Sequence, residues 1–102
     1  MPTAEEIENR VIEAISRAEE ELGLSGAVVF VDGTASCSQC IRIEVSDPDS
    51  FAKAVVALLR QGIATGALPI IVVKRRTTTS LSFYALDIVN NVMVTLELEM
   101  KY

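Results

Sequence analysis

The sequence predicts an α+β domain in which a single layer of five antiparallel strands is combined with two helices in the order αββαβββ. Three observations favour this class. Two segments, residues 3–22 and 50–63, carry apolar residues at helical spacing. Five shorter runs are either apolar throughout or alternate between apolar and polar residues, as strands do. Turn-forming residues separate successive runs and favour hairpins, which pair strands antiparallel.

The first helix has recognisable start and stop residues. Thr3 and Glu6 have the spacing of a capping box, and Gly23 followed by Leu24 is typical of a glycine C-cap with an apolar contact. One face of this segment is an apolar stripe, formed by Ile7, Val11, Ile15, Ala18 and Leu22. We therefore expect an amphipathic helix that covers one surface.

The first two strands are predicted to form a hairpin. Residues 27–31 are apolar on both faces, which is typical of an interior strand. Residues 39–46 alternate, with Ile41 and Ile43 on one face and charged side chains on the other. A loose loop, residues 33–38, would connect them.

The second helix is apolar over an arc about 200° wide, whereas a one-sided helix needs roughly 100°. Asp47 supplies an N-cap and Pro48 fits the first helical position, while Gly62 or Gly66 would end the helix. The wide arc predicts two packing partners. One flank would cover the sheet, and the other would meet a second helix or a second subunit.

The last three strands are predicted over residues 69–73, 81–89 and 92–100. The first is apolar on both faces, and the last alternates most clearly in the whole chain. Asn90 and Asn91 tolerate positive φ and favour a tight hairpin between the last two strands.

Length and charge limit the function classes. With 102 residues, the chain is expected to form a single domain over residues 1–102. Half of the residues are hydrophobic, but no run is long enough to span a membrane, and the N-terminal segment is acidic where a signal peptide would be basic and then apolar. We therefore expect a cytoplasmic protein without a membrane partner. The net charge is −5, and the excess lies entirely in residues 1–25, which argues against nucleic-acid binding.

Candidate chemistry is sparse. The chain contains no histidine, so the usual general base is missing, and we expect no catalytic residues, no metal site, no cofactor and no enzymatic activity. Cys37 and Cys40 form a C-x-x-C pair, which can be a redox pair, half of a zinc site or a disulfide. The expected compartment favours free thiols, although the close spacing leaves a disulfide open. Lys74, Arg75 and Arg76 precede three threonines and form a candidate anion site, with a solubilising strand edge as the alternative.

The element order, together with Gly26-Ala27-Val28-Val29 leading to Asp32-Gly33, resembles the roadblock-type dynein light chain family. The resemblance implies a five-stranded antiparallel sheet in the order 2-1-5-4-3, with a homodimer formed by the second helix and third strand. It also implies a non-enzymatic scaffold that binds dynein intermediate chains or regulates small GTPases. The chain departs from the family in lacking a third, C-terminal helix.

We expect a homodimeric protein-interaction module, with a further protein as a second partner. The third strand would be a sheet edge in the implied order, and an apolar edge strand needs protection. The predicted dimer interface comprises Ala52, Val56, Ile63, Ile70, Ile71, Val72 and Val73. Two alternatives stay open at this point. One is a curved α+β cone that binds a small ligand between sheet and helix, and the other is an engineered or de novo scaffold without native activity.

Overall fold

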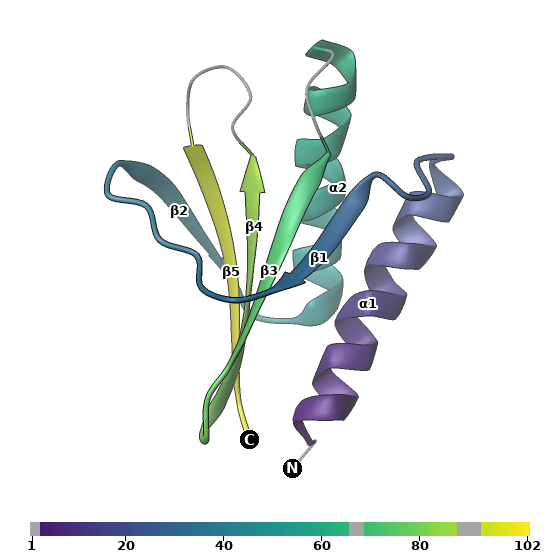
Figure 1. Cartoon of the computed structure of the whole chain (residues 1–102). Helices are drawn as coiled ribbons and strands as arrows, with labels where there is room; N and C mark the ends of the chain where they lie inside the picture. Colours follow the sequence, from purple (N-terminus) through teal and green to yellow (C-terminus); the bar gives the residue numbers. More distant parts are fainter. Residues whose placement is uncertain (1–2, 66–68, 88–92) are drawn as a thin grey trace.

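The protein forms one mixed β-sheet with two helices packed on one of its faces (Figure 1). The computed structural model describes residues 3–65, 69–87 and 93–102. The elements in chain order are α1 (Ala4–Glu21), β1 (Val28–Asp32), β2 (Cys40–Val45), α2 (Pro48–Thr65), β3 (Ile70–Arg76), β4 (Ser80–Asp87) and β5 (Met93–Lys101). The α+β class and the predicted order αββαβββ are therefore confirmed.

The helix ends follow the local sequence rules. The Thr3 hydroxyl accepts a hydrogen bond from the Glu6 amide at 3.2 Å, and the Glu6 carboxylate accepts one from the Thr3 amide, which completes the capping box. At the other end Gly23 adopts a φ of 68°, and the Leu24 amide donates to the Glu19 carbonyl at 2.7 Å. This pair of features is the expected glycine C-cap.

The second helix begins as predicted. Asp47 precedes Pro48, and its carboxylate accepts hydrogen bonds from the amide of Ser50 at 2.9 Å and from the hydroxyl of Ser50 at 2.8 Å. These bonds to the charged form hold the pKa of Asp47 below its usual value of 3.8. Gly62 lies inside the helix and does not end it. Gly66, the other predicted stop, lies outside the described residues.

The sheet is mixed, so the prediction of a fully antiparallel sheet is wrong in this respect. The strand order is β1-β3-β4-β5-β2. The three central strands pair antiparallel, whereas β1 runs parallel to β3 and β2 runs parallel to β5. This order also differs from the 2-1-5-4-3 order that the family resemblance implies. The Asn90-Asn91 turn predicted between the last two strands lies outside the described residues.

The predicted hairpin between the first two strands is wrong, because β1 and β2 lie at opposite edges of the sheet. Their connection, residues 33–39, is hereafter called the crossing loop. Four inter-strand spacings separate the two edges, a distance of about 19 Å. Seven extended residues reach roughly 23 Å. The loop is thus long enough to pass over the whole sheet, as it does in Figure 1.

The core lies between the helices and one face of the sheet. The fully buried side chains include Ile7, Val11 and Ile15 from α1 and Phe51, Val55 and Leu59 from α2. Alternate residues of the central strands meet them, namely Ile70, Val72, Leu81, Phe83, Ala85, Leu96 and Leu98. The period of two in these positions assigns the helices to a single face. The opposite face is the one that the crossing loop passes over.

Both reasons for placing a dimer interface on α2 and β3 are met within one chain. Ala52 and Val56, on the flank of α2, are buried, and Ala52 shares a surface hollow with Ala14 and Ala18 of α1. The second partner of the apolar helix is therefore α1. β3 lies between β1 and β4, so it is an interior strand and not the edge that we expected.

Candidate functional site

In the described part of the sheet, β1 has the longest run of consecutive exposed apolar side chains. Three consecutive side chains, Val29, Phe30 and Val31, are 44%, 37% and 41% exposed. The prediction that this segment is an interior strand is wrong, since β1 has β3 as a neighbour on one side only within the described sheet. Its two apolar faces, which suggested an interior position, are instead both partly open to solvent.

Each face of β1 continues onto a neighbouring element. Phe30 pairs with buried Val72 and points to the helix side, where it lines a hollow of about 190 Å³ together with Ile12 of α1. Val29 pairs with Ile71, which is 44% exposed, on the opposite face. The β1 edge, defined as residues 28–32 with Ile12 and Ile71, is therefore apolar on both sides of the sheet.

Charges at the end of the β1 edge neutralise one another. The Lys74 ammonium lies 2.5 Å from a carboxylate oxygen of Glu8 and 3.0 Å from one of Asp32, and Arg76 also pairs with Glu8. The hydrogen bond to Glu8 is the main cause that raises the pKa of Lys74 above its usual value of 10.5, and Asp32 adds to it. Two cations and two carboxylates leave this end without net charge.

The candidate anion site is not assembled by the fold. Lys74 and Arg76 point to the helix side and are occupied by Glu8. Arg75 pairs with Ser82 in the strand register and lies on the other face of the sheet. The three basic residues therefore do not converge.

The residues of the predicted dimer interface are mostly internal. Ala52, Val56, Ile70, Val72 and Val73 are at most 5% exposed in the single chain. Ile71 is the exception, because it is exposed and forms part of the β1 edge. The side chain of Ile63 lies outside the described residues.

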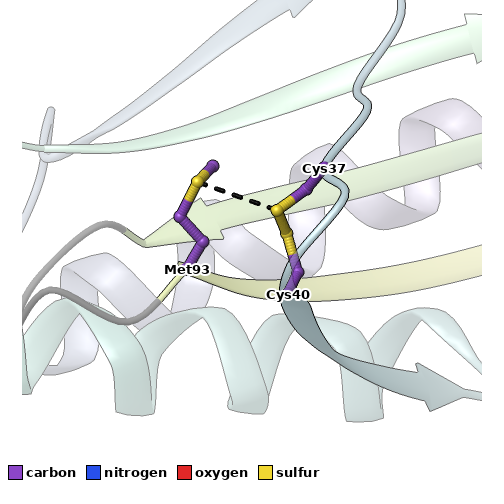
Figure 2. The surroundings of a disulfide bond; sticks show 3 residues. All are labelled: Cys37, Cys40 and Met93. Carbon is purple, nitrogen blue, oxygen red and sulfur yellow. Dashed lines mark hydrogen bonds between the residues drawn. A yellow bond between two sulfur atoms is a disulfide. The ribbon is translucent and has the colours of Figure 1, made fainter.

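Cys37 and Cys40 form a disulfide with a Cα–Cα distance of 5.7 Å, so the favoured interpretation as free thiols is wrong in this structure. The bond closes the last turn of the crossing loop just before β2. Figure 2 shows the Cys37 sulfur next to Met93, with 3.7 Å between the two sulfur atoms. A disulfide sulfur carries no proton, so this is a contact between polarizable sulfur atoms rather than donation.

Two buried carboxylates were not expected from the sequence. Glu19, placed by sequence in an acidic triplet, is 6% exposed and accepts a hydrogen bond from the Ala27 amide at 3.0 Å. Glu97 alternates with apolar residues along β5, which predicts a solvent-facing position, yet it is 5% exposed and pairs with Arg42 of β2. The alternating pattern specifies the face of a strand but not what covers that face.

In the described part of the chain, no three Cys, Asp or Glu side chains gather as a group that could hold a metal ion. Nor does any helix there have the length and apolar character needed to cross a bilayer. No protein-family model, curated protein sequence or solved structure matches the chain. Function must therefore be inferred from the geometry.

Proposed function

We propose that this chain is a non-enzymatic, homodimeric protein-interaction module that associates through the β1 edge. The observation that carries the proposal is the run of three exposed apolar side chains, Val29 to Val31, on a strand at the border of the sheet. The non-enzymatic part rests on the absence of histidine from the sequence.

An exposed edge strand presents unpaired backbone amides and carbonyls, and it acts as a template for another strand. Proteins that stay monomeric usually protect such edges with lysine, proline or inward-pointing charges. Residues 28–31 carry none of these, and Asp32 is neutralised by Lys74. The β1 edge therefore lacks the features that prevent pairing.

The β2 edge differs in this respect. Arg42 and Glu44 occupy alternate positions along β2, and both side chains are more than half exposed. An incoming strand would have to desolvate these charges. Association through β1 is thus favoured over association through β2, although both are edges.

A second copy suits the β1 edge because the strand is nearly symmetric about Phe30. In an antiparallel pair centred there, Val29 lies opposite the partner's Val31, and Phe30 lies opposite the partner's Phe30. Aromatic and β-branched cross-strand pairs contribute roughly 0.2–1 kcal/mol each. The resulting two-fold dimer would have one continuous ten-stranded sheet and no exposed β1 edge.

The test is a charge placed on each edge in turn. Val31→Lys introduces a protective lysine on β1 at a side chain that is 41% exposed, and Ile43→Lys is its matched control on β2, at 44%. Sedimentation velocity at micromolar concentration should show a dimer for the unmodified chain and for Ile43→Lys, but a folded monomer for Val31→Lys. A monomeric unmodified chain would refute the proposal, as would a Val31→Lys variant that remains dimeric.

A further inference from the structure

The crossing loop and the sheet face opposite the helices border a half-open hollow of about 360 Å³. Its lining residues are Ala35, Ser36, Cys37, Cys40, Arg42, Tyr84 and Thr95. The loop forms the roof, and β2, β4 and β5 form the floor. This volume falls in the range of small-molecule sites, and the hollow lies away from the β1 edge.

The floor contains a buried polar group without a partner. Thr95 is 8% exposed, and its hydroxyl oxygen has no hydrogen-bond partner among the residues that the structure describes. Buried hydroxyls are nearly always paired, and one left unpaired destabilises the fold. Thr95 lines the hollow, and rotation of its side chain about χ1 would bring the hydroxyl, which now has almost no accessible surface, to a ligand that accepts or donates a hydrogen bond.

The charges in the hollow argue for an uncharged ligand. Arg42 is the only cation in the lining, and it already pairs with buried Glu97 and lies 3.7 Å from Glu44. An anion would compete with two carboxylates for one guanidinium. The planar guanidinium and the ring of Tyr84 instead offer flat surfaces for a planar group. Hydroxyls of Ser36, Tyr84 and Thr95 can bond to polar atoms on its rim.

We propose that this hollow binds a small, planar, uncharged molecule with hydrogen-bonding groups, held between the crossing loop and the sheet. The Thr95 hydroxyl is the group that recognises it. The disulfide fixes the turn at one end of the roof. The inference does not depend on dimerisation through β1.

Three isosteric probes test the ligand class. Benzamide is neutral, benzoate is its anionic analogue, and benzamidinium is its cationic analogue. Titration of each into ¹⁵N-labelled protein should give saturable amide shifts around Ser36, Tyr84 and Thr95 with benzamide, at millimolar concentration. Benzoate and benzamidinium should bind at least fivefold more weakly. Equal or tighter binding of a charged probe, or no saturable shift with benzamide, would overturn the proposal.

Two variants separate a binding role from a structural one. Thr95→Val removes the unpaired hydroxyl and keeps the shape, so it should raise the melting temperature while weakening benzamide binding at least fivefold. Ser36→Trp, on the exposed loop, should block the hollow without changing the melting temperature. Ser82→Ala, a buried hydroxyl on the same face but outside the hollow, is the control and should leave binding unchanged. Unaltered binding in Thr95→Val, or a lower melting temperature, would contradict the assigned role.

Discussion

The two edges of the sheet are built alike but held differently. Both β1 and β2 run parallel to an outer strand of the antiparallel set β3-β4-β5. β1 is held from the helix side, where Glu8 and Glu19 of α1 reach Lys74 and the Ala27 amide. β2 is held from the opposite side, where Arg42 pairs with Glu97.

The difference follows from what the helices cover. Ile41 and Ile43 of β2 pair with Val94 and Leu96 and therefore share the helix side of the sheet, yet they are 57% and 44% exposed. Each packed helix occupies a width of about 10 Å. Two helices that also pack against each other leave the β2 edge uncovered. On the other face, the Arg42–Glu97 pair adds a polar contact to the strand pairing between β2 and β5, and this contact can be tested separately.

The largest expected change in the free energy of unfolding comes from a substitution on the β2 edge. Arg42→Met leaves the buried Glu97 carboxylate without its cation. The methionine side chain keeps most of the apolar part of the arginine. Leaving a buried carboxylate without its partner costs about 1–3 kcal/mol, and because the Arg42 side chain is 58% exposed we expect a loss of about 2 kcal/mol. Urea unfolding measures the loss.

A second variant separates the charge from the packing. Replacing both partners, with Arg42→Met and Glu97→Leu together, should recover most of the lost stability, because an apolar pair of similar volume is tolerated. On the β1 edge, the matched change Lys74→Met should cost less, since Glu8 keeps Arg76 as a partner. A loss below 1 kcal/mol in Arg42→Met alone would show that the pair does not hold β2.

The β1 edge should respond less strongly and more locally. Glu19→Ala removes the carboxylate that binds the Ala27 amide, but this amide also donates to the Leu24 carbonyl at 3.2 Å. We expect a loss of about 1 kcal/mol. Hydrogen exchange should accelerate at the amides of β1 and remain unchanged at those of β2. Glu19→Gln keeps an acceptor oxygen, so its stability should lie between that of the unmodified chain and that of Glu19→Ala. Equal acceleration at both edges would mean that Glu19 acts on the whole fold.

The sequence predicts the elements of this fold much better than their arrangement. Thr3, Gly23 and Asp47 act within four residues of their own position, so local chemistry is enough to place both ends of α1 and the start of α2. The position of β1 depends on whether a loop folds back or crosses the sheet, and residues 33–39 are long enough for either. Strand partners depend on contacts distant in sequence, which periodicity does not specify.

The candidate sites also divide into those that depend on local sequence and those that depend on contacts distant in sequence. The pairing of Cys37 with Cys40 needs only a tight turn, and the sequence left it open as one alternative. The exposed β1 edge could not be foreseen, because an all-apolar strand is typical of an interior position. The hollow under the crossing loop exists because the loop crosses the sheet. It could not be predicted, since the sequence indicated a hairpin at this position. The unpaired Thr95 hydroxyl likewise cannot be predicted from the sequence, because it depends on what covers the sheet face opposite the helices.

The smallest difference between the two edges concerns pH. The pKa of Lys74 is raised in the folded state, so its pairing stabilises the β1 edge fully below pH 10.5 and is lost as the pH rises through the raised value. The stability difference between the unmodified chain and Lys74→Met should therefore be constant near neutral pH and shrink in alkali. Asp47, at the start of α2 after β2, has a lowered pKa, so the effect of Asp47→Asn should shrink only in acid, below about pH 3.8. Melting temperatures of the unmodified chain and both variants from pH 3 to 11 measure the change in alkali and the change in acid. If the effect of Lys74→Met stays unchanged in alkali, the charge of Lys74 is not what holds this end of β1.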